Sequence, residues 1–224
     1  MSPPEIRNAA TVIVLRDAAT TPRVLMGQRG QSAVFMPNKF VFPGGALDGT
    51  DAAVPLAKPL RDTCMARLKA QADATLAAPL VAAAIRELWE ETGLLLGAAD
   101  DAAPDQDVPA DWQSYFAHGL RPSGEGMRFV FRAITPPGRT RRFDARFFLV
   151  DADRIVNDLD DFTEASEELS LLQWIPLSDA RSFDLPFITE VVLAEIEADI
   201  REPGRNAGVP FFYNDEGRSF FSRL

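Results

Sequence analysis

Residues 86 to 93 read Arg-Glu-Leu-Trp-Glu-Glu-Thr-Gly, and this stretch decides how the chain folds. It completes a run from Leu80 to Thr92 whose apolar residues recur at helical spacing, which predicts an amphipathic helix. Gly93 stands where a helix C-terminus favours glycine. At about 100° per residue, the acidic residues of the stretch share one face of the helix. They are Glu87, Glu90 and Glu91.

This acidic face predicts a cation site. Three neighbouring carboxylates repel one another, and a divalent cation relieves the repulsion. Oxygen donors suit Mg²⁺ or Mn²⁺ rather than a structural zinc. The alternative is a solvated acidic surface. The upstream segment Phe42-Pro43-Gly44-Gly45 favours the site, because its glycines let backbone approach a ligand or metal, and the loop after it adds Asp48 and Asp51.

Composition narrows the class of protein. The chain has 224 residues, of which 46% are hydrophobic and 25% charged, which is ordinary for a globular protein with a sizeable core. With 23 basic and 33 acidic residues the formal net charge is −10, so nucleic acid and anionic membranes are poor partners. No apolar run is long enough for a membrane helix, and the N-terminus does not resemble a signal peptide. The single cysteine, Cys64, fits a cytoplasmic protein.

The remaining pattern mixes strands and helices without βαβ regularity, which predicts a mixed sheet with helices packed on it in one domain. Predicted strands are 10–16, 23–29, 40–42, 128–134, 145–151 and 171–175, the first two forming a hairpin. Predicted helices are 60–76, 80–92, 186–200 and a short one at 111–118. Residues 97–109 and the acidic segment 157–168 are expected to be loops, and 209–224 a hairpin turning at Asp215-Glu216-Gly217.

The acidic stretch resembles the signature of the Nudix hydrolases, which ends in Arg-Glu-apolar-x-Glu-Glu-x-Gly-apolar. Residues 86 to 94 match this half completely. The first half begins at Gly45 and places Asp51 where the family has glutamate. The spacer that follows, residues 52 to 85, has 34 residues where the family has seven. The resemblance implies a Nudix-like α/β/α sandwich with a mixed sheet, an inserted helix at about 52–80 and a C-terminal hairpin. It makes residues 8–200 one domain and 201–224 an extension of it.

An insertion at this place is typical of one subgroup, the peroxisomal coenzyme A diphosphatase-like Nudix proteins and their bacterial relatives. Three further segments are similar to that subgroup: Gln28-Arg29 with Phe35-Met36-Pro37, residues 138–144 (Gly-Arg-Thr-Arg-Arg-Phe-Asp), and Glu168 five residues before Gln173-Trp174. A different coenzyme A signature is broken, because Val34 stands in the place of its second arginine. The resemblance to the first subgroup nevertheless makes coenzyme A or its acyl form the favoured substrate.

The resemblance implies a Mg²⁺- or Mn²⁺-dependent hydrolase that cleaves a nucleoside diphosphate linked to another group. The implied metal ligands are Glu87, Glu90, Glu91 and the Gly45 carbonyl. Arg86 would hold the carboxylates and the loop in place. The general base would be a box glutamate such as Glu90 or a distant acid, with Glu168 the leading candidate and Glu164 and Glu167 its rivals.

Arginines are the candidates for holding the phosphates of the substrate, because the guanidinium group binds phosphate in a bidentate manner. They are Arg29, Arg139, Arg141 and Arg142, and for each the alternative is a structural ion pair. His118 and Cys64 are expected to be structural. An isopentenyl isomerase, which shares the fold, would need a catalytic cysteine, and Cys64 lies in the wrong segment.

Three other interpretations stay open. The same chemistry could act on ADP-ribose, a dinucleotide or an oxidised nucleotide, because specificity lies in loops outside the signature. A ligand sensor without catalysis is disfavoured, since all three glutamates are present and no helix-turn-helix pattern is found. The inserted helix could also mediate a homodimer.

Overall fold

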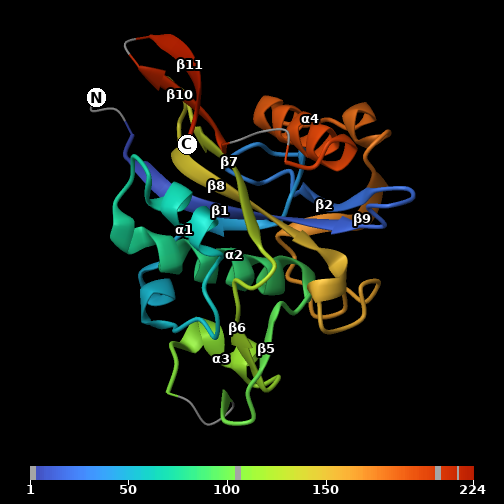
Figure 1. The fold of residues 1–224 in the computed structure, drawn as a ribbon. Helices are drawn as coiled ribbons and strands as arrows, with labels where there is room; N and C mark the ends of the chain where they lie inside the picture. Colours follow the sequence, from blue (N-terminus) through green and yellow to red (C-terminus); the bar gives the residue numbers. More distant parts are fainter. Residues whose placement is uncertain (1–3, 104–106, 205–207, 216) are drawn as a thin grey trace.

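The computed structural model describes residues 4–103, 107–204, 208–215 and 217–224. Within these ranges, nine strands form one mixed sheet (Figure 1). The strands are β1 (Ile6–Arg16), β2 (Arg23–Arg29), β3 (Phe40–Val41), β4 (Gly44–Ala46), β7 (Arg128–Ile134), β8 (Arg142–Asp151), β9 (Leu169–Pro176), β10 (Pro210–Asp215) and β11 (Arg218–Arg223). Their order is β11-β10-β7-β8-β1-β2-β3, with β4 paired to β1 and β9 paired to β2.

Strand β1 is the centre of the sheet. It pairs in parallel with β8 and antiparallel with β2 and β4. The predicted hairpin of β1 and β2 is confirmed, and so is the mixed sheet, because β10 also runs parallel to β7. Strand β4 was not predicted: its two glycines are poor strand formers, and the segment pairs with Ala9–Thr11 only because β1 leaves an edge open there.

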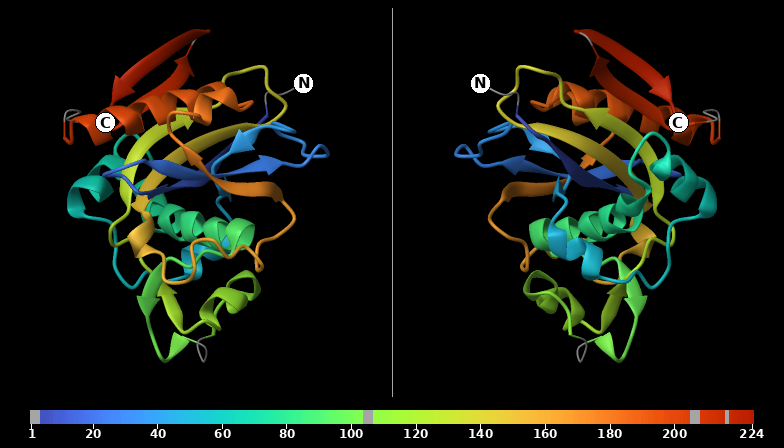
Figure 2. Two further views of the ribbon diagram at one scale, coloured as in Figure 1. Left: turned by 90° about the vertical axis from the view of Figure 1, so that its right-hand side faces the viewer. Right: turned by 90° about the vertical axis from the view of Figure 1, so that its left-hand side faces the viewer.

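Two helices cover the two faces of the sheet. Helix α2 (Ala77–Thr92) packs on Ala10, Val12 and Val14 of β1, whereas α4 (Phe187–Arg201) packs on the face that carries Ile13 and Leu15. Since successive strand side chains point to opposite faces, the nearly unbroken apolar run of β1 serves both layers. The two helices lie on opposite sides of the sheet in all views (Figures 1 and 2).

The predicted helix over residues 60–76 is wrong in its length. Helix α1 spans only Asp62–Lys69, because Ala70 is extended and Gln71 has a φ of 51°. The Arg132 guanidinium on β7 donates to the carbonyls of Ala70 (3.4 Å) and Gln71 (3.0 Å), which gives the end of the helix hydrogen-bond partners. Two short 3₁₀ turns flank α1, namely η1 (Gly49–Ala53) and η2 (Ala74–Leu76). Two others follow β8 and precede α4, namely η5 (Ala152–Arg154) and η6 (Ala180–Ser182).

A small lobe lies below α2 in Figure 1. It contains a two-stranded antiparallel sheet of β5 (Gly97–Ala99) and β6 (Leu120–Pro122), together with η4 (Ala110–Trp112) and α3 (Gln113–Phe116). The predicted short helix is therefore confirmed in part, and the predicted loop over 97–109 is corrected at its start, while residues 104–106 lie outside the described ranges. Buried Trp112, Tyr115 and Phe116 stabilise the lobe.

The end of the chain forms the predicted hairpin. Strands β10 and β11 pair over their full length, and β10 attaches the hairpin to β7; Glu216 of the predicted turn is not among the described residues. In the described part of the chain, no helix is long and apolar enough to cross a membrane.

Candidate active site

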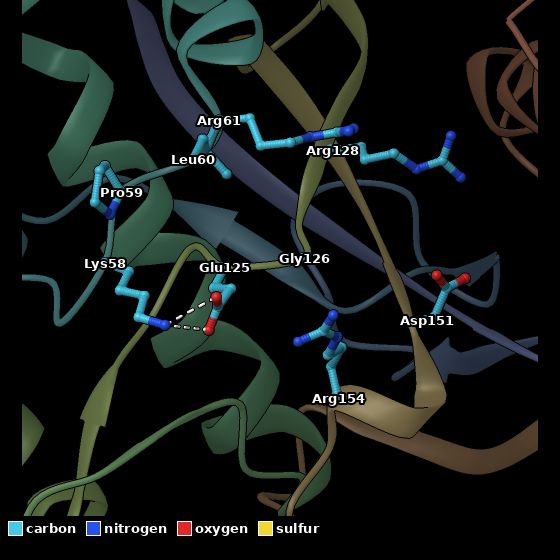
Figure 3. Close-up of a pocket in the computed structure, with 9 residues that line it drawn as sticks. All are labelled: Lys58, Pro59, Leu60, Arg61, Glu125, Gly126, Arg128, Asp151 and Arg154. Atoms are coloured by element: carbon cyan, nitrogen blue, oxygen red, sulfur yellow. Dashed lines mark hydrogen bonds and ion pairs between the residues drawn. The ribbon is translucent and has the colours of Figure 1, made fainter.

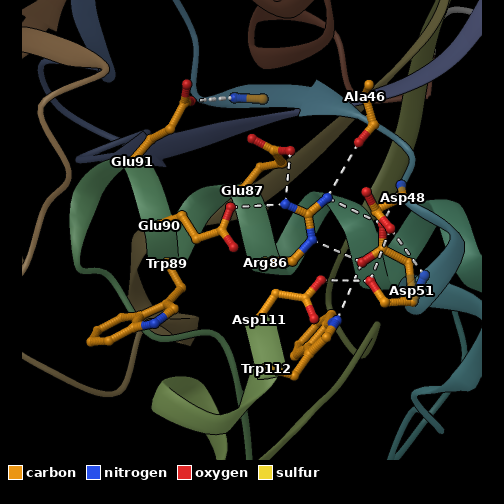
Figure 4. A network of polar contacts seen from close by, with 12 residues as sticks. Ala46, Asp48, Asp51, Arg86, Glu87, Trp89, Glu90, Glu91, Asp111 and Trp112 are labelled. Atoms are coloured by element: carbon orange, nitrogen blue, oxygen red, sulfur yellow. Dashed lines mark hydrogen bonds and ion pairs between the residues drawn. The ribbon is translucent and has the colours of Figure 1, made fainter. Parts of the chain in front are cut away.

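The acidic stretch forms the last two turns of α2, and Arg86 is its centre (Figure 4). The side chain is only 8% exposed. Its Nε and Nη2 donate to the two oxygens of Asp51, at 2.9 and 3.2 Å, and Nη2 also donates to the Ala46 carbonyl at 3.2 Å. Its Nη1 reaches Glu87 at 3.0 Å and Glu90 at 2.8 Å. Arg86 therefore joins two glutamates of α2 to Asp51 and to the Ala46 carbonyl.

Asp51 reaches Arg86 in spite of the 34 residues that separate them. The intervening segment folds away from the site as η1, α1 and η2, and α2 then returns Arg86 to Asp51. Within η1, the Asp51 carboxylate accepts the backbone N–H of Asp48 at 2.9 Å, and the Asp48 side chain caps Thr50. Trp112 of the small lobe adds a bond from Nε1 at 3.3 Å. The insertion thus lengthens the signature without separating its two halves.

Two glutamates lie deep against the glycine segment. Glu91 accepts the N–H of Gly44 at 2.7 Å, and the Glu87 carboxylate lies so close to Gly45 that a Cβ on Gly45 would collide with it. Burial raises the pKa of Glu87 to about 7, although Arg86 acts in the opposite direction. Burial raises the pKa of Glu91 to about 8, and the nearby Glu87 charge adds to this rise.

Glu90 differs from these two because its side chain is 36% exposed. Its pKa is also raised, mainly by burial, while its bond to Arg86 opposes the rise. The outward position of Glu90 leaves it free to contact solvent as well as Arg86. Glu87 and Glu91 are therefore the inner carboxylates of the site, and Glu90 is the outer one.

The carboxylates fit a divalent cation by their chemistry. The raised pKa values of Glu87 and Glu91 show that ionising both buried carboxylates is unfavourable, and a cation held by oxygen ligands would remove the repulsion between the ionised groups. In the described ranges, no three acidic, histidine or cysteine side chains form a ready cation cluster. The reason is visible in Figure 4, where Glu87 and Glu90 turn to Arg86 while Glu91 turns to Gly44.

The acidic loop 157–168 folds back onto the end of α2. Asn157 accepts the N–H of Leu95 at 2.9 Å and donates to the Gly93 carbonyl at 2.8 Å, and the N–H of Ser166 donates to the Glu90 carbonyl at 2.8 Å. The charge of Glu168 contributes to the raised pKa values of Glu87 and Glu91, so this exposed acid faces the inner carboxylates.

The two rival acids of this loop differ from Glu168 in position. Glu164 lies beside Gly93, where a Cβ on the glycine would meet the Glu164 Cβ at 3.2 Å. Glu167 is exposed, and in the described structure no hydrogen bond or ion pair joins it to the carboxylates of α2. Of these three acids, only Glu168 is among the main causes of the raised pKa values of Glu87 and Glu91.

The predicted arginines separate into two groups. Arg29 at the end of β2 lowers the pKa of Glu91, so it faces the site, and its buried Nε has no hydrogen-bond partner among the described residues. Arg139 and Arg141 are exposed on the turn before β8, and Arg142 donates to the Thr135 carbonyl at 3.0 Å. No hydrogen bond or ion pair in the described ranges joins these three to the carboxylates of α2.

Sequence reasoning missed the part played by the small lobe. Besides Trp112, its Asp111 accepts a hydrogen bond from the Thr50 hydroxyl, and its charge raises the pKa of Glu90. His118 packs edge-on against Trp89 with ring centroids 4.7 Å apart, which agrees with its expected structural role. The sequence carries no signal for these contacts, because they join segments about 60 residues apart whose spacing follows no motif.

Comparison with known proteins agrees with the resemblance to the Nudix hydrolases. No family model matches the chain. It is 30% identical to "Putative nudix hydrolase 7" of Caenorhabditis elegans over 178 residues, which are 75% of this chain and 51% of that protein. The crystal structure of a Nudix hydrolase from Alicyclobacillus acidocaldarius superposes with a TM-score of 0.62 at 28% identity and covers 88% of this chain and 96% of that one. These likenesses support membership of the Nudix hydrolase family.

The likeness to the structure from Alicyclobacillus acidocaldarius also confirms the predicted fold class. A MutT protein from Methanosarcina mazei Go1, with a TM-score of 0.50 and 13% identity, shares the fold over 90% of this chain and 99% of that one. The chain spans about half the length of the curated Nudix relative it matches, so the activity of that whole protein does not transfer directly. What the site can do must be argued from its own residues.

Proposed function

We propose that this chain is a divalent-cation-dependent hydrolase that cleaves the pyrophosphate bond of a nucleoside diphosphate linked to another group. One observation carries the proposal: Glu87 and Glu91 are buried together with raised pKa values, and the one cation bonded to Glu87, Arg86, is shared with Asp51, Glu90 and the Ala46 carbonyl. A buried pair of this kind needs additional positive charge, and oxygen donors select Mg²⁺ or Mn²⁺.

In the proposed mechanism the side chains of the site hold the cation and the diphosphate, and one of them accepts a proton from the attacking water. Glu87, Glu90, Glu91 and the Gly45 carbonyl would hold the cation, which when bound neutralises the diphosphate and lowers the pKa of water. Arg86 and Asp51 fix the carboxylates, and the Gly44 N–H orients Glu91. The guanidinium group of Arg29, whose charge acts on Glu91, would bind a phosphate oxygen. Glu168 accepts the proton of the attacking water, and Glu90 is the alternative base.

Within this class we propose coenzyme A or acyl-coenzyme A as the substrate. Two of the segments similar to that subgroup meet in space, since Phe35 packs edge-on against Phe143 with centroids 5.1 Å apart. The third segment supplies Glu168, which faces Glu87 and Glu91. The turn with Arg139, Arg141 and Arg142 would then contact the part of the substrate outside the diphosphate. ADP-ribose, dinucleotides and oxidised nucleotides are the alternatives.

Product analysis tests the proposal. The protein is incubated with Mg²⁺ and, separately, coenzyme A, acetyl-coenzyme A, ADP-ribose, NADH or a dinucleoside polyphosphate, and mass spectrometry identifies the products. We expect coenzyme A to give 3′,5′-ADP and 4′-phosphopantetheine, and Glu91→Gln to lose the activity. Glu168→Gln should reduce kcat by about a hundredfold, whereas Glu167→Gln, its neighbour, serves as the matched control.

Other outcomes have separate meanings. Cleavage of another substrate supports the hydrolase and overturns the coenzyme A assignment. Cation binding without cleavage of any substrate favours a ligand sensor. A homodimer through α1 is also a proposal, and a monomer in sedimentation at high protein concentration would contradict it. The exposed residues of α1 include Asp62, Thr63, Ala66 and Lys69, while Cys64 and Leu68 face the core.

A further inference from the structure

A hollow of about 600 Å³ lies outside the candidate active site, between the insertion and the ends of strands β7 and β8 (Figure 3). One wall is residues 58–61 of the insertion, a second is the loop before β7, and a third is the end of β8 with η5. The lining residues are Lys58, Pro59, Leu60, Arg61, Glu125, Gly126, Arg128, Asp151 and Arg154. None of them belongs to the group around Arg86, so this is a separate hollow.

Positive charge dominates the hollow although the whole chain is acidic. Four of its side chains are cationic and two are anionic. Lys58 is neutralised by Glu125, with both oxygens at 2.9 Å, and Arg128 is paired with Asp199 of α4 at 2.6 Å. Arg61 and Arg154 have no hydrogen bond or ion pair in the described ranges. Asp151 remains as the one acid of the lining without an ion pair there.

The two open cations stand on different walls. Arg61 extends from the start of α1 toward β7, where Arg128 lies, and Arg154 rises from η5 toward Gly126 (Figure 3). Arg154 contributes to the lowered pKa of Glu125 and therefore faces the Lys58–Glu125 pair across the hollow. Both guanidinium groups line the hollow, and each can offer two parallel N–H donors to an anion inside it.

The walls are tied together by backbone contacts. The N–H of Ala57 donates to the Pro122 carbonyl and the N–H of Gly124 donates to the Lys58 carbonyl, both at 2.8 Å. The contact at Gly124 is so close that a Cβ there would lie 2.9 Å from the Leu60 nitrogen. These backbone contacts fix residues 57–60 of the insertion against residues 122–124, which precede β7.

We propose that this hollow binds a small anion with two or more negative charges, such as a phosphate-bearing metabolite. Its volume lies within the usual range of small-molecule pockets, about 300 to 1,000 Å³. A single carboxylate would pair with one of the two open arginines, whereas a polyphosphate or a phosphorylated ligand can reach both. The net charge of −10 makes a small anion a better occupant than nucleic acid, whose long phosphate backbone the acidic remainder of the surface would repel.

Such a ligand would also hold the insertion in place. Residues 58–61 belong to the segment between Asp51 and Arg86, while Arg128 and Arg154 belong to the body of the sheet. A ligand that bridges the two walls binds only when the insertion is docked, so it stabilises the docked form by RT ln(1 + [L]/Kd), where [L] is the free ligand concentration. The proposal does not depend on the activity proposed for the candidate active site.

Calorimetric titration with tripolyphosphate, after divalent cations have been removed on a chelating resin, tests the inference, because without these cations the acidic face of α2 repels the probe and no free polyanionic chelator competes for the hollow. We expect the Arg61→Ala/Arg154→Ala variant to bind at least about tenfold more weakly than the wild type. The Arg7→Ala/Arg218→Ala variant is the matched control: it loses the same charge from two exposed arginines outside the hollow and should bind like the wild type.

Amide chemical shifts locate the bound probe. Tripolyphosphate should move the resonances of Arg61, Gly124 and Gly126 while those of Gly44 and Gly45 stay in place. All four substituted arginines are exposed or on the surface, so the variants should keep the wild-type Tm. Equal affinity of the two double variants, shifts centred on Gly44 and Gly45, or binding of polyglutamate as tight as that of tripolyphosphate would each overturn the inference.

Discussion

At the scale of single residues, Asp51 shows how a shorter acid can replace a glutamate. It lies in the third position of η1, where its carboxylate accepts the N–H of Asp48 while the Asp48 side chain caps the same turn. This reciprocal capping holds Asp51 toward α2, so the missing methylene is compensated by the position of the turn. Both halves of the signature were visible in the sequence, but their contact across the insertion was not.

Asp51→Asn should destabilise the protein by about 3 kcal/mol. Arg86 would remain buried after losing its best ion pair, and a buried charge without its partner is strongly destabilising. The free energy of unfolding is measured by urea denaturation. Asp48→Asn is the control, since asparagine also caps a turn and Asp48 is exposed, and it should cost less than about 0.5 kcal/mol. Equal losses in the two variants would contradict the role of the Asp51–Arg86 pair.

The inner glutamates predict an unusual pH dependence of stability. In the unfolded chain a glutamate ionises near its ordinary pKa of 4.5. In the folded protein the pKa of Glu87 is raised to about 7 and that of Glu91 to about 8, so both stay protonated to a higher pH. The cost of ionising these groups in the fold is absent below 4.5, grows as pH rises, and is complete above about 8. Tm measured in EDTA should therefore fall through this window.

Two comparisons separate this effect from other titrations. Excess Mg²⁺ should restore Tm more strongly at pH 8 than at pH 5, because the cation binds the ionised carboxylates. Glu91→Gln should show a smaller fall in Tm over the same window, since glutamine does not titrate. A Tm in EDTA that rises from pH 5 to pH 8, or an unchanged slope in the variant, is incompatible with the raised pKa values.

At the scale of elements, the sequence predicted those parts that carry a clear period. Helix α2 and strands β1, β2 and β7 follow apolar patterns, and their positions agree with the prediction. Strands β4 and β5 consist of glycine and alanine and have no apolar period, so only pairing partners reveal them. The end of α1 is likewise set from outside, by Arg132 on β7, which no local pattern announces.

Arg132 belongs to a buried charge cluster that joins the insertion to the sheet. It binds Asp144 through two hydrogen bonds of 2.9 and 2.8 Å, and Arg146, only 1% exposed, contacts the same acid at 3.0 Å. Asp144→Asn should cost about 3 to 5 kcal/mol, because two buried arginines would then lack their shared carboxylate.

The control for this prediction is Asp199→Asn, which removes a half-exposed acid from Arg128. Surface pairs contribute about 0 to 1 kcal/mol, so this variant should unfold close to the wild type in urea. Hydrogen exchange should in addition show faster opening of residues 62–71 in Asp144→Asn, since Arg132 holds the end of α1. A loss of stability without faster exchange there would separate the cluster from the insertion.

At the scale of the whole molecule, the candidate site is assembled from segments that are remote in sequence. β2 supplies Arg29, η1 supplies Asp51, α2 supplies the glutamates, and the loop 157–168 supplies Glu168. The sequence indicated these members through their resemblance to a known signature. It did not indicate Trp112 or Asn157, because each makes a hydrogen bond to a residue far away in the sequence, and no regular spacing of residues predicts such a bond.

Asn157 should control activity from a distance. Its side chain joins the loop that carries Glu168 to Leu95 and to the Gly93 carbonyl, so Asn157→Ala releases the loop from the end of α2. A displacement of about 1 Å can cost up to a hundredfold in rate. We expect kcat on the cleaved substrate to fall by at least about tenfold, with hydrogen exchange rising over residues 157–168 and Tm changing little. Asp161→Ala, which removes a hydrogen bond to Thr163 within the same exposed loop, should leave kcat near the wild-type value. If exchange rises in Asn157→Ala while kcat is unchanged, the position of this loop does not set the rate, and Glu90 becomes the better candidate for the base.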